Sequence, residues 1–225
     1  DPSLIRELAH SLKISGTLAT LLVNRGVTDP ALAQRFLCPR FDHLEDPFLM
    51  RDLQRAVDRI FLGIQRREKI LIYGDYDVDG TTGTSVLVSF LREIGAEPIY
   101  HVPHRIEEGY GLNIDGLRRL KERGASLVVT VDCGISNAGE IDAARGFGLD
   151  VVVVDHHQPP DDLPLAVAVI NPHRRDCQFP DKGLCAAGLA FYLVIGLRAK
   201  LREIGWFITS GDPDVRRYLD IVTLG

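Results

Sequence analysis

The pattern of apolar positions divides the chain near residue 66. Before that point, apolar residues recur at helical spacing, first at Leu4, Leu8 and Leu12 and again within residues 50–66. Gly26 and the Asp29-Pro30 pair interrupt these stretches as turn signals do. We therefore predict a small helical N-terminal region over residues 1–66, in which no residue pattern indicates chemistry.

From residue 69 onward, short β-branched runs alternate with amphipathic stretches. The predicted strands are 69–73, 97–102, 126–132, 150–155 and 166–171. The predicted helices are 81–94, 114–123, 137–147, 185–203 and 213–223. Such alternation is typical of an α/β fold, with a parallel sheet and helices on both of its faces. We assign this fold to a domain over residues 67–225.

Acidic side chains follow three of the predicted strands. The first strand leads into residues 74–80, GDYDVDG, the third ends at Asp132, and the fourth leads into residues 155–157, DHH. Parallel strands place their carboxyl ends along one edge, where open α/β sheets bind ligands. Any one of these residues could be a helix cap or a polar strand end. Together they favour a cation site, because so many clustered carboxylates repel unless cations neutralise them.

The composition is consistent with the predicted fold and cation site. The chain is 45% apolar and 25% charged, as soluble globular proteins are. No apolar run reaches the ~18 residues that a membrane span requires. The first residues lack a signal-peptide pattern, and the four scattered cysteines are typical of reduced thiols, so we predict a cytoplasmic protein. A net charge of −5 argues against nucleic-acid binding unless bound cations supply the positive charge.

Three local motifs each lack a residue that their function requires. DYDVDG resembles the start of an EF-hand loop, but Val86 stands where the loop needs Glu. The glycines at 183 and 188 have P-loop spacing, but Leu189 replaces the phosphate-binding Lys. His101 and His104 have no partner at structural-zinc spacing.

The series DYDVDG, VDCG (131–134) and VVVDHH (152–157) resembles the motifs of DHH phosphoesterases. Further segments resemble the RecJ-like single-strand-specific DNA exonucleases of that superfamily. These segments are 14–37, 46–57, 102–113 (VPHRIEEGYGLN), 171–193 and 218–225. The resemblance covers nearly the whole chain. It implies a 5′-to-3′ exonuclease that hydrolyses single-stranded DNA in repair and recombination.

The resemblance also implies two metal positions that share Asp132 as a bridge. One would use Asp75 and Asp77 with Asp132, and the other would add Asp79, His156 and Asp220 to Asp132. Asp155 would orient a ligand, and His157 would face the scissile phosphate, so we group His157, Asp132 and Asp155 as catalytic. Without the resemblance, Asp220 would be read as a solvated helix charge.

Aspartates with one imidazole suit two Mn²⁺ or Mg²⁺ ions, and the imidazole favours Mn²⁺. Two such ions can activate a water and stabilise the leaving oxygen of a phosphodiester. Arg105, Arg174 and Arg175 are candidate phosphate contacts, because a guanidinium can donate two parallel hydrogen bonds. The alternative for each of them is a surface arginine.

RecJ-like proteins carry a second domain after the DHH domain, and the resemblance implies that this C-terminal domain is absent from residues 1–225. Single-stranded DNA would be the partner, with a helicase and a single-strand-binding protein as open candidates. Three alternatives remain: a nanoRNase or cyclic-dinucleotide phosphodiesterase, a manganese pyrophosphatase, and a non-catalytic DNA-binding relative. Tyr73 stands where such pyrophosphatases carry a His, and the complete ligand set favours an enzyme.

Overall fold

The computed structural model describes residues 1–225, which form two compact units, Asp1–Glu45 and Asp46–Gly225. The first unit is helical, as predicted. Its elements are α1 (Pro2–Leu12), α2 (Gly16–Asn24), α3 (Pro30–Leu37) and the 3-10 turn η1 (Phe41–His43). Asp1, Ser15 and Asp29 cap the three helices through their side chains. A small apolar cluster around Leu8 and Leu22 holds this unit together.

The second unit begins at Asp46, which is earlier than the predicted boundary between residues 66 and 67. It opens with the 3-10 turn η2 (Pro47–Leu49) and helix α4 (Leu53–Gln65). The apolar stripe of α4, including Val57 and Ile60, lies in the main hydrophobic core of this unit. Helical periodicity alone could not show that this stripe packs against the sheet.

The second unit is built on a parallel sheet of five strands. The strands are β1 (Lys69–Gly74), β2 (Ile99–His101), β3 (Ala125–Val131), β4 (Asp150–Val154) and β5 (Ala168–Ile170). Their order is β2-β1-β3-β4-β5, and all four neighbouring pairs are parallel. The order reverses at β1, so the crevice between the ends of β1 and β3 is the expected ligand site.

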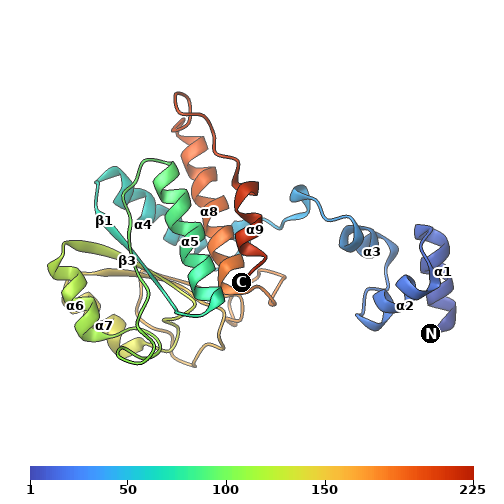
Figure 1. The fold of residues 1–225 in the computed structure, drawn as a ribbon, viewed down its shortest axis with the longest axis horizontal. Coiled ribbons are helices and arrows are strands. Elements are labelled where there is room, and N and C mark those ends of the chain that lie inside the picture. Colours follow the sequence, from blue (N-terminus) through green and yellow to red (C-terminus); the bar gives the residue numbers. More distant parts are fainter. The chain divides into compact units, whose positions relative to one another are not determined.

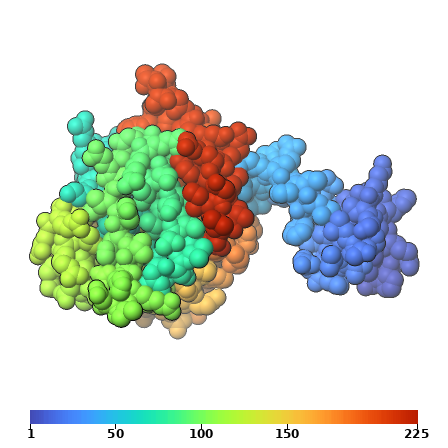
Figure 2. Space-filling model, viewed as in Figure 1, coloured from blue at the N-terminus to red at the C-terminus, as the bar shows by residue number.

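Helices cover both faces of the sheet (Figure 1). One face is covered by α4, α5 (Val78–Glu93) and α8 (Ala186–Glu203), and the other by α6 (Ile114–Glu122) and α7 (Ala138–Gly146). The turn η3 (Val215–Tyr218) and the short helix α9 (Leu219–Val222) follow α8. In Figure 2 the last residues, in red, lie against α5, in green. The predicted α/β fold with helices on both faces is confirmed.

Strands β1, β3, β4 and β5 are almost entirely buried, whereas the edge strand β2 is partly exposed, and the side chains of the buried strands alternate between two cores. Ile72, Val129 and Val152 face the α4–α5–α8 layer, while Leu71 and Val128 face the α6–α7 layer. This explains the nearly continuous β-branched runs in the sequence. None of the helices combines the length and the apolarity that crossing a membrane requires.

Candidate metal centre

The loop after β1 is folded tightly onto the start of α5. Asp77 is the N-cap of α5, and its Oδ1 accepts a hydrogen bond of 2.9 Å from Gly80 N. A Cβ at Gly80 would lie 2.6 Å from the carbonyl oxygen of Asp75, so only glycine fits there. The close approach buries Asp75 and leaves its Oδ1 without a hydrogen-bond partner.

Asp79, in the first turn of α5, is held by the N-terminus of α8. Its two carboxylate oxygens accept hydrogen bonds of 2.7 Å each, one from Ala186 N and one from Ala187 N. These amides are among those that have no partner within their own helix, and the positive end of the helix dipole favours a carboxylate. The orientation of Asp79 is therefore fixed by a segment far from it in the sequence.

Asp132 follows β3 and lies at the centre of the cluster. Its side chain is almost fully buried, and its Oδ1 accepts no well-formed hydrogen bond, although imidazole nitrogens of His156 and His157 lie 3.2 and 3.9 Å from it. Its backbone φ of 65° is in the left-handed region, where residues other than glycine are uncommon and often functional. Burial, together with the nearby charges of Asp79 and Asp77, raises the pKa of Asp132 to about 8. A cation would relieve this repulsion.

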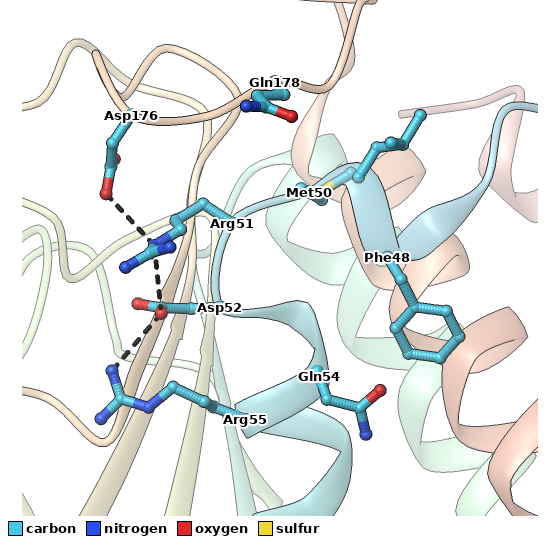
Figure 3. A pocket seen from close by; sticks show the side chains of 9 residues that line it. Phe48, Met50, Arg51, Asp52, Gln54, Arg55, Asp176 and Gln178 are labelled. Atoms are coloured by element: carbon cyan, nitrogen blue, oxygen red, sulfur yellow. Dashed lines mark hydrogen bonds and ion pairs between the residues drawn. The ribbon is translucent and has the colours of Figure 1, made fainter.

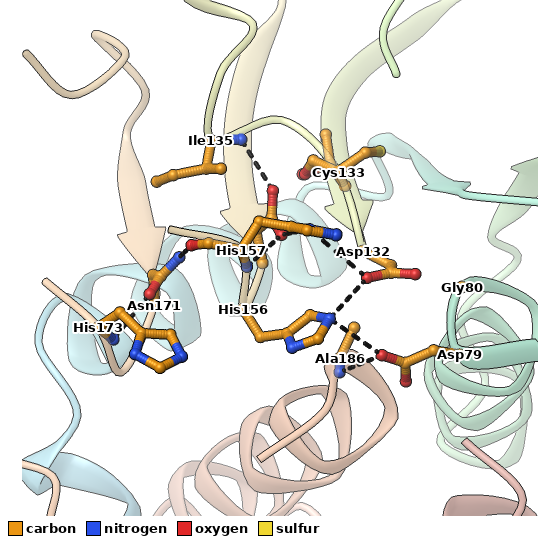
Figure 4. Close-up of polar contacts among 12 residues, drawn as sticks. Asp79, Gly80, Asp132, Cys133, Ile135, His156, His157, Asn171, His173 and Ala186 are labelled. Atoms are coloured by element: carbon orange, nitrogen blue, oxygen red, sulfur yellow. Dashed lines mark hydrogen bonds and ion pairs between the residues drawn. The ribbon is translucent and has the colours of Figure 1, made fainter. Parts of the chain in front are cut away.

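The two histidines after β4 face different partners (Figure 4). His156 Nε2 lies 3.2 Å from Asp132 Oδ1 and 3.5 Å from Asp79 Oδ2. His157 Nδ1 instead lies 2.7 Å from Oδ1 of the buried Asp155. Asp155 is itself fixed, since its Oδ2 accepts a hydrogen bond of 3.0 Å from Ile135 N. Asp155 thus fixes the Nδ1 side of the His157 ring.

Two groups of potential ligand atoms share Asp132. One consists of Asp75, Asp77 and Asp132, the other of Asp132, His156 and His157, and within each group the ligand atoms lie within 4.8 Å of one another. The buried oxygens of Asp75 and Asp132 that accept no hydrogen bond are the donors a hard divalent cation needs. The residues present therefore fit a pair of divalent cations, and the sharing of Asp132 agrees with a bridging role.

Two further residues at this site were missed by sequence reasoning. Tyr110 donates a hydrogen bond of 3.1 Å from its hydroxyl to the carbonyl oxygen of Asp132, and its ring meets His157 edge-on. The buried Asn171 donates a bond of 2.8 Å from Nδ2 to the carbonyl oxygen of His157. Both lie inside segments that resemble the RecJ-like exonucleases, which was the only signal in the sequence.

The three candidate arginines have different surroundings. Arg105 is exposed, and its guanidinium lies 5.2 Å from the ring centroid of Tyr76, which stands between Asp75 and Asp77. Its role as a phosphate contact stays a prediction, now with a location beside the cluster. Arg175 points into solvent, with a side chain 92% exposed and 2.9 Å from Asp161, and it also stays a prediction.

The prediction that Arg174 contacts phosphate is wrong, because its guanidinium is buried and each of its three nitrogens donates a hydrogen bond within the protein. It lies 2.7 Å from Asp52 Oδ2 and 2.8 Å from Asp176 Oδ2, and it donates a hydrogen bond of 2.6 Å to the carbonyl oxygen of Val169. These contacts join the start of α4 to β5. Arg174 therefore holds the fold together and has no free donor geometry for phosphate.

A pocket of about 420 Å³ adjoins this ion-pair network (Figure 3). Its charged walls pair with one another, since Arg51 lies 3.2 Å from Asp176 and Arg55 lies 3.4 Å from Asp52. Neither group of potential metal ligands includes a residue of its lining. The pocket is therefore separate from the candidate metal centre.

We expect Arg174→Ala to destabilise the protein by about 3–5 kcal/mol, because it leaves the partly buried Asp52 without its main partner. Arg175→Ala is the matched control, with an expected change within about 0.5 kcal/mol, because its side chain is exposed. Urea unfolding of both variants measures the difference. Equal unfolding free energies for the two variants would contradict a structural role for Arg174.

The structure also disagrees with the prediction that Asp220 is a metal ligand. Asp220 is exposed on α9 and lines a shallow pocket with Ser89 and Glu93 of α5. Those residues lie 10 and 14 positions after Asp79, or about 15–21 Å further along the helix axis. Neither Asp220 nor Asp79 belongs to a group of potential ligands, but Asp79 Oδ2 lies 3.5 Å from His156 Nε2, whereas no such contact brings Asp220 to the cluster. In the structure it is Gly225 that approaches the cluster, since a Cβ there would lie 3.0 Å from Asp79 Oδ1.

The fold and the site together define a class: an α/β protein with a carboxylate–histidine centre at the switch point of a parallel sheet. Residues 69–225 match the model of the family described as "DHH family, N-terminal domain". The chain therefore belongs to the DHH family. The three residues that give the family its name are Asp155, His156 and His157, which the structure places at this centre.

Proteins of similar sequence show which members of the DHH family this chain resembles. The chain is 41% identical over 203 residues to the single-stranded-DNA-specific exonuclease RecJ of Bacillus subtilis, covering 90% of this chain and 26% of that protein. The RecJ of Dickeya dadantii is 40% identical over 227 residues, covering 100% of this chain and 38% of the relative. The predicted resemblance to RecJ-like exonucleases is confirmed.

Solved structures of RecJ also resemble this chain in fold. A structure of RecJ from Thermus thermophilus in complex with Mn²⁺ superposes with a TM-score of 0.75 at 27% identity, covering 98% of this chain and 29% of that one. A manganese-bound exonuclease RecJ superposes with a TM-score of 0.67 at 33% identity, covering 77% and 42%. The chain thus spans about a quarter to two fifths of the length of these relatives.

Proposed function

We propose that this chain carries the catalytic centre of a metal-dependent phosphodiesterase that degrades single-stranded DNA from a 5′ end. The single observation that carries the proposal is the sharing of Asp132 by two groups of potential metal ligands. The names of the relatives support the substrate class, since they are single-stranded-DNA-specific exonucleases. We also propose a role in DNA repair and recombination, which the resemblance to RecJ-like exonucleases implies.

Two divalent cations are the expected cofactors, with Mn²⁺ favoured over Mg²⁺. The donor set of carboxylates and imidazole supports both ions, and related RecJ structures were solved with each of them. When bound, the cations would supply an activated water and stabilise the leaving oxygen. Asp75 and Asp77 would hold one ion, Asp79 and His156 the other, and Asp132 would bridge them.

The protein's own groups would act on the phosphodiester beside the cations. Asp155 holds the Nδ1 side of His157, so the other ring nitrogen can donate to a phosphate oxygen when the ring is protonated. Asn171 fixes the backbone of His157 and thereby the direction of the ring. Arg105 would contact a phosphate next to the scissile one. Such preorganised donors stabilise the charge that develops in the transition state.

Location and partners complete the proposal. The four cysteines form no disulfide, which supports a cytoplasmic protein. A helicase and a single-strand-binding protein remain the proposed partners.

The substrate class is tested with two proteins. One is the chain alone, and the other is the chain fused at its C-terminus to the residues of B. subtilis RecJ that follow the matched region. With Mn²⁺, we expect nucleotides to be released from the 5′ end of a single-stranded oligonucleotide, while blunt duplex stays largely intact. Pyrophosphate and a cyclic dinucleotide are the comparison substrates. Faster hydrolysis of either of them than of the oligonucleotide would refute the proposal.

Metal binding should also release protons in a pH-dependent way. The pKa of Asp132 is raised to about 8, so at pH 7 this carboxyl is mostly protonated and must lose its proton to bind a cation. We expect about one proton released per chain near pH 6–7, falling as the pH rises past 8. Calorimetric Mn²⁺ titrations in buffers of different ionisation enthalpy measure this number. Proton release that increases with pH would instead indicate that the protons come from a metal-bound water.

The same shift sets the pH dependence of the metal-free protein. Because the folded pKa of Asp132 lies above its unfolded value, its stabilising contribution is complete below about pH 4 and is lost as the pH rises through about 8. Unfolding curves without metal should therefore show a falling contribution over that range, and Mn²⁺ should reverse it.

A further inference from the structure

The 102–113 loop, which connects β2 to α6, brings Tyr110 to Asp132 of the candidate metal centre and places Arg105 over the ring of Tyr76. Most of its tip is exposed, and Ile106 is 88% exposed. A loop with so little apolar burial needs polar contacts to keep one conformation. Three of these contacts come from a single acidic side chain in the loop, that of Glu108.

Glu108 makes contacts on both sides of this loop. Its Oε2 accepts a hydrogen bond of 2.8 Å from His104 N, while Glu108 N donates a bond of 2.8 Å to the carbonyl oxygen of His104. The two bonds are reciprocal and close the tip that contains Arg105. Reciprocal bonds of this type fix the ends of a short turn, as a capping box does at a helix start.

The same carboxylate attaches the closed tip to the body of the fold. Glu108 Oε2 also lies 3.1 Å from Nε2 of His101 in β2, and Oε1 lies 3.7 Å from a guanidinium nitrogen of Arg119 in α6. The side chain of Glu108 is only 19% exposed, so these charged contacts are partly shielded from solvent. One side chain thus ties the tip to a strand and to a helix.

The C-terminal part of the loop is tied separately to the sheet. Tyr73 donates a hydrogen bond of 3.1 Å from its hydroxyl to the carbonyl oxygen of Gly111. Tyr110 reaches the carbonyl oxygen of Asp132 at the same distance. Between these ties and His104, two side chains join the tip to the fold: Arg105, whose guanidinium lies over the ring of Tyr76, and Glu108, which alone makes hydrogen bonds and ion pairs there. Loss of Glu108 would therefore free Arg105 first and Tyr110 next.

We propose that Glu108 is a positioning residue, which holds the 102–113 loop so that Arg105 and Tyr110 face the bound phosphodiester. This inference rests on the proposed function and adds a determinant of substrate binding outside the metal ligands. Glu108 is not itself in contact with the carboxylate cluster, so its effect should reach the substrate and leave the metal unaffected.

The first test needs no activity. Trypsin can cut after Arg105, at the exposed tip, once the loop leaves its closed conformation. In Glu108→Ala we expect this cut to be roughly tenfold faster than in the wild type, because a charge-assisted hydrogen-bond cluster is lost. Glu107→Ala is the matched control, because Glu107 is exposed in the same loop, and its cut rate should not change. Glu108→Gln keeps an acceptor for His104 N and should restore most of the protection.

The second test separates positioning from folding. With a single-stranded oligonucleotide, Glu108→Ala should raise KM roughly tenfold, while Mn²⁺ affinity and melting temperature stay near the wild-type values. Glu107→Ala should leave KM unchanged. Should Glu108→Ala fail to fold, Arg119→Ala, which removes one exposed partner, should give the same changes at smaller size.

The outcomes are distinct. A cut rate after Arg105 equal to that of the wild type overturns the proposal, as does a KM equal to that of Glu107→Ala. A parallel loss of Mn²⁺ affinity would show that Glu108 supports the fold and does not position the loop. If the wild type itself hydrolyses no oligonucleotide, the proposed function fails, and the proteolysis result still decides whether Glu108 holds the loop.

Discussion

Replacing Asp132 by alanine is expected to weaken Mn²⁺ binding by well over a hundredfold and to reduce turnover to near the background rate. Changes outside the set of metal ligands already cost about 10- to 100-fold in metal affinity or activity. Asp132 belongs to both groups of potential ligands, so its loss should disturb both ions at once. Calorimetric Mn²⁺ titration and turnover on a single-stranded oligonucleotide measure the two effects.

The control for this prediction is the stability of the metal-free protein. Asp132→Asn keeps the size of the side chain and removes a buried charge, so without metal it should be at least as stable as the wild type at pH 8. Loss of metal binding in a variant that folds normally identifies a ligand. Equal Mn²⁺ affinity in the wild type and in Asp132→Ala would count against the bridge.

The two adjacent histidines should fail in different ways when each is replaced by alanine. His156 Nε2 faces Asp132 and Asp79, so its loss should weaken Mn²⁺ affinity, and excess Mn²⁺ should restore part of the activity. His157 is held by Asp155, so its loss should leave metal affinity nearly intact while turnover falls by about 10²–10³-fold. Added metal should not rescue His157→Ala.

The same pair of measurements can contradict this assignment. His157 also lies within reach of Asp132, at 3.9 Å, and belongs to one group of potential ligands. If His157→Ala loses metal binding and His156→Ala keeps it, the roles of the two residues are reversed. Asp155→Asn offers an independent check, because it should reproduce the turnover loss of His157→Ala without affecting Mn²⁺ affinity.

Much of the fold and the centre of the site could be predicted from the sequence, because both depend on local patterns. Buried β-branched runs mark the strands, and parallel strands bring their carboxyl ends to one edge. Asp75, Asp132 and His156 therefore came together without any knowledge of helix packing. The bounds of β2 were less accurate, since only Ile99–His101 of residues 97–102 are paired in the sheet.

The wrong assignments have a common physical cause, which is that side-chain surroundings are set by tertiary packing. Arg174 reads as a free cation in the sequence, but Asp52, more than a hundred residues away, pairs with it. Asp220 begins a motif in the segment 218–225 that resembles the RecJ-like exonucleases, but the position of α9 along α5 places it away from the cluster. Tyr110 was missed because a loop tyrosine carries no pattern that shows which atom its hydroxyl will reach.

The hydrogen bonds from Ala186 N and Ala187 N to Asp79 make the metal centre a late product of folding. The partners of these bonds are 107 and 108 residues apart, so the contact closes a long loop that local structure cannot form alone. Cation affinity should therefore appear only when α8 has docked on α5. Conversely, a cation at Asp79 should slow hydrogen exchange of these two amides, because their opening would then require release of the ion.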